Sequence, residues 1–400
     1  MAPLGPFDRK RRVAVGVSGG ADSMALASLL ARWGAPQAVI VDHGLRPGSA
    51  AEADEAAGRL AAIGVPARVA RIAVPSGSGV SERARQARYA ALLSECRALG
   101  CADLLLAHHA GDQAETVRMR QQAGSGPAGL AGMAAITYRD GARLLRPLLT
   151  VAPTRLRATL RQAGLAHAED PTNRDQRFLR ARLRRSMTAA DVADALAVAA
   201  ERGPARHRLE CAIADELAAV EIRPEGYALL PGPIGPEALS ALIWTLSGRL
   251  YPPGPIEWRE QTRHGMVLAR AGRLGAGWLL AREPAAVAPP IPARLGAHWD
   301  GRYLVTADPG PGIEIGALGP DAPRLRRLSG LPSLILRGLP AFRRGGELVA
   351  VPHLPFPKSS SSLNLLRLRT TRPAAGAPFA PAELVRSGGG CTGDAHSPFG

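Results

Sequence analysis

The stretch Arg11–Gly34, RRVAVGVSGGADSMALASLLARWG, decides the fold that we expect for the rest of the chain. Its apolar residues Val13–Val17 predict a strand, and Met24–Trp33 predict a helix that ends at Gly34. The polar turn Ser18–Ser23 joins them, and its adjacent glycines let successive N–H groups point into one concavity. A turn of this kind at the start of a helix predicts a phosphate-binding loop.

Two familiar glycine-rich loops do not fit this turn. A Walker loop requires Gly-x-x-x-x-Gly-Lys-Ser/Thr, but the chain has lysine only at Lys10 and Lys358. A dinucleotide-binding loop requires Gly-x-Gly-x-x-Gly, but Ser18 occupies the middle glycine position after Gly16. A carboxylate at Asp22 is best explained by a cation held beside the phosphates, and we expect Mg²⁺. An ordinary strand-to-helix turn rich in small residues is the alternative.

The composition indicates a globular protein with a polyanionic partner. The 400 residues are 46% apolar, enough for two or three domains, and 4% aromatic, so Ala, Leu and Val should dominate the core. The formal net charge of +16 favours nucleic acid or an anionic membrane surface as partner. No apolar stretch reaches the roughly 18 residues of a membrane span, and the cysteines lack metal-binding spacing. We therefore expect a cytoplasmic protein with inert thiols and no membrane contact.

Strands and helices alternate after the first turn. Strands are predicted over 38–41, 67–73 and 103–107, helices over 51–63, 81–99 and 154–162, and a hairpin over 136–145. This order predicts an α/β fold with a doubly wound, Rossmann-like parallel sheet, whose strands end at one ligand-binding edge. Asp42 and His43 follow the second strand, so we expect them near the phosphate-binding turn.

The loop after the fourth strand carries further polar residues. Asp112 and Glu115 stand three residues apart, so a helix would present them on one face of its first turn, with His108 just before it. The alternative is that the helix dipole alone favours these acids. Because the loop belongs to the same sheet edge, we expect the acids to face the phosphate-binding turn.

Two later segments suggest contacts with a substrate. Gly124–Gly132, GSGPAGLAG, is predicted to be a flexible loop that acts as lid, substrate contact or linker. Beyond Arg174, a helix would place Arg177, Arg180 and Arg184 on one face, which suits contacts to phosphate groups. A solvated basic face is the alternative.

Composition divides the chain into four parts. Residues 8–187 are expected to form the α/β domain, 188–285 a mainly helical binding or linker region, and 293–375 a small β-rich domain. Short strands of that domain are predicted over 299–306, 313–317, 334–337 and 347–351. Residues 376–400 are expected to form a disordered tail.

Four motifs together resemble the tRNA(Ile)-lysidine synthetase family, within the N-type ATP pyrophosphatases or PP-loop enzymes. They are Ser18–Ser23 (SGGADS), Val41–Arg46 (VDHGLR), His108–Thr116 (HHAGDQAET) and Glu169–Asn173 (EDPTN). The resemblance covers Arg11–Met187 and returns near Leu339–Leu354.

The resemblance implies a ligase that acts on the wobble cytidine in the CAU anticodon of tRNA(Ile). ATP would adenylate the C2 oxygen of this cytidine and release pyrophosphate, and the amine of L-lysine would then displace AMP to give lysidine. The implied ATP-binding residues are Ser18, Gly19, Gly20, Ala21, Asp22, Ser23, Asp42 and His43. The implied catalytic residues are Asp22, His108, Asp112 and Glu115, with Mg²⁺ held by Asp22 and Asp112. The implied tRNA contacts are Arg174, Arg177, Arg180 and Arg184.

Two questions stay open within this resemblance. The lysine amine must lose a proton, and either a carboxylate or His108 would accept it. Members of the family usually have aspartate where this chain has Gly111. Because Asp112 and Glu115 remain, we expect activity to be retained.

Three other functions compete with this interpretation. A PP-loop tRNA thiolase would deliver sulfur, but it generally needs paired or cluster-binding cysteines, which this chain lacks at suitable spacing. A non-catalytic tRNA-binding homologue would be consistent with Gly111, although the intact turn Ser18–Ser23 argues against it. A small-molecule amidating ligase would leave the positive charge unexplained.

Overall fold

The computed structural model describes residues 1, 4–5, 7, 12–44, 48–73, 80–139, 142–168, 179–249, 252–356 and 365–367. The chain forms two compact units, the first over Met1–Arg208 and the second over Leu209–Ala375. The domain boundaries expected after residues 187 and 285 stay predictions. The predicted tail, 376–400, lies outside the described residues.

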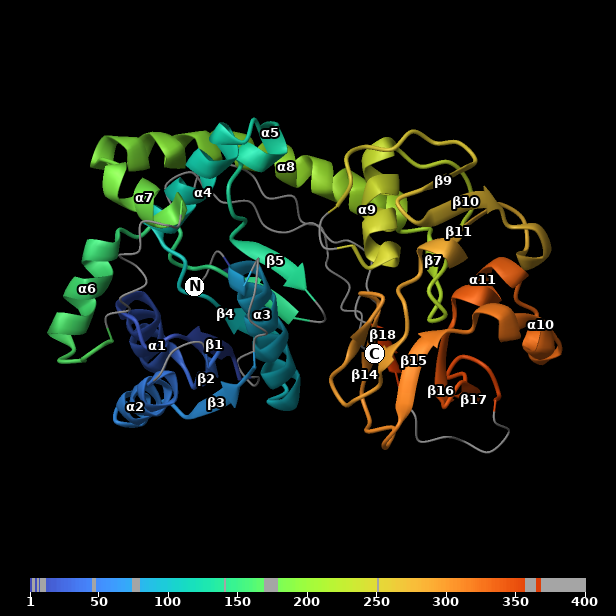
Figure 1. The fold of residues 1–400 in the computed structure, drawn as a ribbon. Helices are drawn as coiled ribbons and strands as arrows, with labels where there is room; N and C mark the ends of the chain where they lie inside the picture. The colour runs from blue at the N-terminus through green and yellow to red at the C-terminus, as the bar shows by residue number, and fades with distance from the viewer. Residues whose placement is uncertain are drawn as a thin grey trace. The chain divides into compact units, whose positions relative to one another are not determined.

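A six-stranded sheet forms the centre of the first unit, in the order β3-β2-β1-β4-β6-β5 (Figure 1). The strands are β1 Ala14–Val17, β2 Gln37–Asp42, β3 Ala67–Arg71, β4 Asp103–Leu105, β5 Ile136–Arg139 and β6 Ala142–Leu145. All neighbours from β3 to β6 pair in parallel, and β5 pairs antiparallel with β6. The predicted parallel sheet is confirmed. Because the chain goes from β1 to β2 and β3 on one side and resumes with β4 on the other, the loops after β1 and β4 flank the topological switch point.

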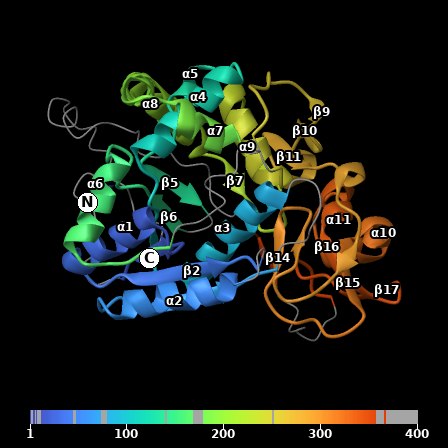
Figure 2. The ribbon, with the colours of Figure 1, turned by 60° about the vertical axis from the view of Figure 1, so that its left-hand side comes forward.

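Different helices cover the two faces of this sheet. They are α1 Ala21–Trp33, α2 Ser49–Ala61 and α6 Pro153–Gln162 on one face, and α3 Val80–Ala98 on the other (Figures 1 and 2). Successive strand residues point to opposite faces, so Val15 and Val17 pack towards α1, whereas Ala14 packs towards α3. This double covering explains why β1 is a continuous small and apolar run, buried throughout.

A layer of helices follows β4 in the first unit. They are α4 Ala110–Gln122, α5 Pro127–Leu130, α7 Leu179–Ser186 and α8 Ala189–Leu217. Ala114 and Val117 of α4 pack with Ala195 and Ala199 of α8. This shared apolar cluster attaches α4 to α8 within the first unit.

The glycine-rich segment Gly124–Gly132 is held by more contacts than its composition predicts. It contains α5, and Arg120 donates a hydrogen bond to the carbonyl of Gly132 (2.9 Å). The buried amide of Gln113 donates to the carbonyl of Met133 (3.0 Å) and accepts from its N–H (2.7 Å). The role of this segment as lid, substrate contact or linker stays a prediction.

The second unit, taken by itself, begins with antiparallel strands around α9 Pro236–Ser247. They are β7 Glu221–Ile222, β8 Ala228–Leu230, β9 Gln261–Arg263, β10 Met266–Arg270 and β11 Trp278–Arg282, in the order β7-β8-β11-β10-β9. The region 188–285, expected to be mainly helical, therefore contains these strands besides α8 and α9, and its division as a domain stays a prediction. The strands have only two to five residues, mostly of types with little β preference, so cross-strand pairing rather than local propensity determines them.

The remainder of the second unit is β-rich, as predicted. One sheet consists of β12 Ile291–Pro292, β15 Ile313–Ala317, β16 Pro340–Arg344 and β17 Glu347–Ala350, and another of β13 His298–Trp299, β14 Tyr303–Val305 and β18 Leu365–Arg367. Two short helices accompany them, α10 Ala322–Leu325 and α11 Ser333–Gly338. The strand predicted over 334–337 is wrong because these residues form α11, and a short apolar run does not distinguish a strand from a buried helical turn.

Candidate active site at the switch point of the sheet

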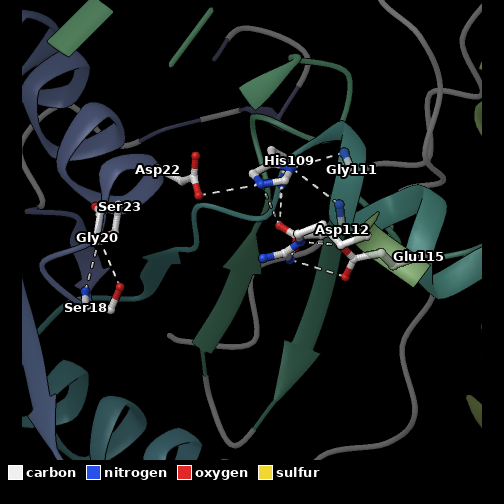
Figure 3. A network of polar contacts seen from close by, with 9 residues as sticks. Ser18, Gly20, Asp22, Ser23, His109, Gly111, Asp112 and Glu115 are labelled. Carbon is white, nitrogen blue, oxygen red and sulfur yellow. Dashed lines mark hydrogen bonds and ion pairs between the residues drawn. The ribbon is translucent and has the colours of Figure 1, made fainter. Parts of the chain in front are cut away.

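The phosphate-binding turn connects β1 directly to α1. The helix begins at Ala21, earlier than predicted, so Asp22 and Ser23 lie in its first turn. Ser23 Oγ donates to the carbonyl of Gly20 (3.0 Å) and accepts from the N–H of Ser18 (3.1 Å), which holds the turn closed (Figure 3). The N-cap residue Gly20 has no side chain to satisfy the first N–H groups of the helix, so they are available to an anion.

Gly19 shows why this turn needs glycine. Its φ is +79°, in the left-handed region that side chains disfavour. Its carbonyl accepts a hydrogen bond from the N–H of Ala168 (2.9 Å), so the chain returns to the turn immediately before the motif 169–173. That motif itself lies outside the described residues.

His109 joins the two loops that the sequence predicts to face each other. It is the N-cap of α4, where its Nδ1 accepts hydrogen bonds from the N–H groups of Gly111 (3.0 Å) and Asp112 (3.3 Å). Asp112 Oδ2 in turn accepts from the N–H of His109 (3.0 Å), which completes a capping box. Because Nδ1 is an acceptor, the ring proton lies on Nε2. That atom is 3.5 Å from Asp22 Oδ2 and 3.6 Å from Asp112 Oδ2 (Figure 3).

The pKa values of His109 and Asp22 shift in opposite directions. Burial alone would lower the pKa of His109, but the hydrogen bond to Asp22 and the charges of Asp112 and Asp22 raise it. Burial alone would likewise raise the pKa of Asp22, but His109, Arg157 and Arg184 lower it. The carboxylate of Asp22 therefore stays ionised at the positive end of α1.

Sequence reasoning chose His108 and missed His109. The available signal was the spacing His-x-x-Asp at a helix start, which is a capping box with histidine in place of serine or threonine. His108 lies beside Arg146 and Arg88, and burial together with these charges lowers its pKa to about 3. His108 is therefore neutral near pH 7 and a weak proton acceptor.

Glu115 and Asp112 share a cationic partner from α7. Arg184 Nε donates to Glu115 Oε1 (2.6 Å), and its Nη2 donates to Glu115 Oε2 (3.3 Å) and Asp112 Oδ1 (3.1 Å). The Glu115 side chain is only 3% exposed, and burial raises its pKa more than Arg184 lowers it. Asp112 and Glu115 thus lie on one face of α4 beside the phosphate-binding turn. Arg184 binds both of them, a contact that the sequence did not predict.

The predicted basic face is only partly described. Arg180 is exposed on α7, and Arg174 and Arg177 lie outside the described residues. Arg184 binds Asp112 and Glu115. Its predicted contact with phosphate would require the guanidinium to bind the two acids and the phosphate together. The tRNA-contact assignments stay predictions.

Asp42 and His43 lie where the sequence places them, after β2. Val17, the last residue of β1, pairs with Ile40 of β2. Asp42 is two residues further along β2, so it lies level with the turn that follows β1. Asp42 accepts a hydrogen bond from the N–H of Gly44 (3.0 Å), and this bond, with one from Ser49, lowers its pKa. Asp42 is therefore an ionised acceptor at the sheet edge. Its role in ATP binding stays a prediction.

The glycine at position 111 leaves room for the ring of His109. A Cβ added to Gly111 would lie 2.9 Å from His109 Cε1 and 3.2 Å from its Nδ1. Any side chain at this position would therefore displace the ring that caps α4. The absence of the usual aspartate is compatible with the cap seen here.

The acids of this site suit Mg²⁺ in combination with a nucleotide. Asp22 and Asp112 offer carboxylate oxygens on either side of His109 Nε2, and Mg²⁺ favours oxygen ligands. Among the described residues, no three His, Cys, Asp or Glu side chains are grouped so as to bind a metal by themselves. Phosphate oxygens and water would complete the coordination, as is usual for this ion.

Comparison with known proteins identifies the family. The PP-loop domain family matches residues 2–190. The tRNA(Ile)-lysidine synthase of Ruegeria pomeroyi is 34% identical over 376 residues, which cover 86% of this chain and 88% of that protein. The chain belongs to the tRNA(Ile)-lysidine synthase family. The tRNA(Ile)-lysidine synthase of Novosphingobium aromaticivorans is 39% identical over 298 residues, covering 70% of this chain and 91% of that one. The Bradyrhizobium sp. relative is 47% identical over 190 residues, 46% of this chain and 53% of its own length.

Membership of the lysidine synthase family confirms the resemblance drawn from the motifs. The cysteines support it against the thiolase alternative. Cys96 and Cys101 are buried, and burial raises the pKa of Cys96 to about 12, so its thiol stays protonated.

In the described part of the chain, no helix is both long and apolar enough to cross a membrane.

Proposed function

We propose that this chain joins L-lysine to the wobble cytidine in the CAU anticodon of tRNA(Ile), using ATP and Mg²⁺. The C2 oxygen of cytidine attacks the α-phosphorus of ATP, and pyrophosphate leaves. The lysine amine then attacks C2, AMP leaves with the oxygen, and the amine loses a proton. One observation carries the proposal: His109 connects Asp22 of the phosphate-binding turn to Asp112 of α4 within 3.6 Å.

The turn between β1 and α1 supports the first step. The N–H groups at the start of α1 have no side-chain cap, and Ser23 holds the turn in shape through Gly20 and Ser18, which suits the departing pyrophosphate. Asp22 would hold Mg²⁺ in this site, and the ion would supply positive charge for the leaving group. His109 holds the Asp22 carboxylate in place for this purpose.

The acid pair of α4 supports the second step. Asp112 and Glu115 would bind the ammonium of the incoming lysine, and Arg184, which they orient, would bind its carboxylate. This division of roles explains why an arginine and two acids lie together at the edge of a nucleotide site.

A carboxylate is a better proton acceptor here than His108. The pKa of about 3 makes His108 a weak base, and Nδ1 of His109 is occupied by the α4 cap. Burial raises the pKa of Glu115, which brings this carboxylate closer to the range useful for a general base. We assign proton acceptance to Glu115.

Pyrophosphate release from ATP tests the proposal. The wild type should release pyrophosphate only when both CAU-anticodon tRNA(Ile) and ATP are present, and Asp22→Ala should abolish the release. Asp54→Ala is the matched control, because Asp54 is an exposed aspartate of α2 that pairs with Arg71 (2.8 Å). Release without tRNA would indicate a small-molecule ligase, and no release despite tRNA binding would indicate a non-catalytic protein. Either result would refute the proposal.

A further inference from the structure

A second group of basic side chains gathers at the same sheet edge, on the side covered by α3. We call it the α3 cationic cluster, and it consists of His43, Arg85, Arg88, His108 and Arg146. His43 and Arg146 follow β2 and β6, His108 follows β4, and Arg85 and Arg88 belong to α3, which packs over β2 and β4. Four elements therefore bring positive or hydrogen-bonding groups to one place.

The charges of this cluster act on one another, and Asp42 partly offsets their effect on His43. Burial and Arg88 lower the pKa of His43, and burial, Arg146 and Arg88 lower that of His108. Burial lowers the pKa of Arg88 and of Arg146 as well. Among the described residues, no carboxylate contributes to the pKa shifts of Arg88, Arg146 or His108.

Other half-buried arginines in the described residues bind either an acid or backbone carbonyls. Arg143 binds Asp103 (2.6 Å), and Arg343 binds Asp321 (2.8 Å). Arg120 instead donates to the backbone carbonyls of Gly129 and Gly132. Among the described residues Arg88 binds neither an acid nor a carbonyl, so its guanidinium is available to an anion from outside the chain.

Several polar atoms of the cluster also lack a partner. In the described part of the chain, Nδ1 of His43, Nδ1 of His108 and Nε of Arg146 are shielded from solvent and make no hydrogen bond. An unsatisfied buried group of this kind costs about 1–3 kcal/mol. The buried side of the cluster is therefore polar and under-satisfied, a feature that calls for a functional explanation.

The cluster is braced and still accessible. Arg146 Nη1 donates to the carbonyl of Ala134 (2.9 Å) and to Thr137 Oγ1 (3.1 Å), which fixes its guanidinium. The buried ring of Tyr89 stacks under Arg85, whose guanidinium carbon lies 5.4 Å from the ring centroid. Arg85 itself is exposed, and Arg88 and Arg146 are half-buried, so a ligand can reach them.

We propose that the α3 cationic cluster binds a backbone phosphate of the RNA substrate beside the reacting nucleotide. The phosphates of ATP already have the turn Ser18–Ser23, and planar guanidinium groups suit a phosphodiester. This inference rests on the proposed function for the identity of the RNA. The cluster would hold the strand while the cytidine base enters the site between β1 and β4.

The test uses the full-length chain with Arg88→Gln, and with Arg59→Gln as control. Arg59 is an α2 arginine paired with Glu55, so its replacement removes the same charge elsewhere. Affinity for CAU-anticodon tRNA(Ile) is measured at several salt concentrations, and affinity for ATP separately. Arg88→Gln should weaken tRNA binding about tenfold, reduce the salt dependence by about one phosphate contact, and leave ATP affinity unchanged.

Three results would overturn the inference. The first is that Arg88→Gln loses affinity for ATP and keeps its affinity for tRNA, which would assign the cluster to the nucleotide. The second is that Arg88→Gln binds both ATP and tRNA as the wild type does. The third is that Arg59→Gln and Arg88→Gln weaken tRNA binding equally. If Arg88→Gln fails to fold, the exposed Arg85→Gln replaces it with the same expected pattern. Wild type that binds tRNA through Arg88 but releases no pyrophosphate would refute the proposed function and leave the cluster assignment intact.

Discussion

His109 has two roles, and two substitutions can distinguish them. Its Nδ1 caps α4, and its Nε2 faces Asp22 at 3.5 Å. His109→Ala removes both functions. His109→Asn keeps a good N-cap acceptor but is too short to reach Asp22.

The magnitudes follow from these contacts. Loss of an N-cap costs about 1 kcal/mol, and truncation of a ring that is 6% exposed adds lost packing, so we expect about 2 kcal/mol for His109→Ala. This loss should lower Tm by about 4–8 °C for a unit of this size, and His109→Asn should recover about half of it. Loss of the partner that orients Asp22 should reduce the rate of lysine incorporation about 10–100-fold in both variants.

The assay combines thermal unfolding with single-turnover incorporation of labelled lysine into tRNA. The essential result is that His109→Asn recovers part of the lost stability but none of the lost rate of lysine incorporation. An asparagine variant as fast as the wild type would refute the positioning role. An alanine variant as stable as the wild type would refute the cap.

Three further predictions concern neighbouring residues. Because the pKa of His108 is lowered to about 3, its contribution to stability is present above its unfolded pKa and is lost as pH falls from about 6.5 towards 3. In urea unfolding, this residue should make the free energy of unfolding of the wild type about 1–2 kcal/mol lower at pH 5 than at pH 7. His108→Asn should lack this part of the pH dependence. Gly111→Ala should lower Tm and the incorporation rate because its Cβ displaces the His109 ring; a rise in Tm from helix propensity alone would contradict this. Arg184→Ala should raise KM for lysine roughly tenfold with little change in KM for ATP, since it leaves Glu115 without its partner; equal effects on both substrates would count against the lysine site.

The sequence predicts the parts of this protein that are determined locally. The strand, the double glycine and the helix around Ser18–Ser23 are specified within one short stretch, and the alternation of strands and helices specifies the parallel sheet. The three-residue spacing of Asp112 and Glu115 placed them correctly on one face of α4, because helix geometry alone fixes that relation.

The missed features depend on contacts between distant residues. Arg184 binds Glu115 across 69 positions of sequence, which no local pattern reveals. His109 was missed because histidine is an unusual N-cap residue and His108 stands beside it. The strands β7 and β8 within 221–230 are too short, and too poor in β-branched residues, for periodicity to detect.

The most direct test of the central claim is the mass of the wobble nucleoside. Unmodified CAU-anticodon tRNA(Ile) is incubated with the wild type, ATP, Mg²⁺ and isotope-labelled L-lysine, then digested to nucleosides for mass spectrometry. The proposed reaction yields a cytidine that has gained one lysine and lost one water, formed by the wild type and by Asp54→Ala but not by Asp22→Ala. Unmodified cytidine in the wild-type reaction, from protein that binds both ATP and tRNA, would contradict it.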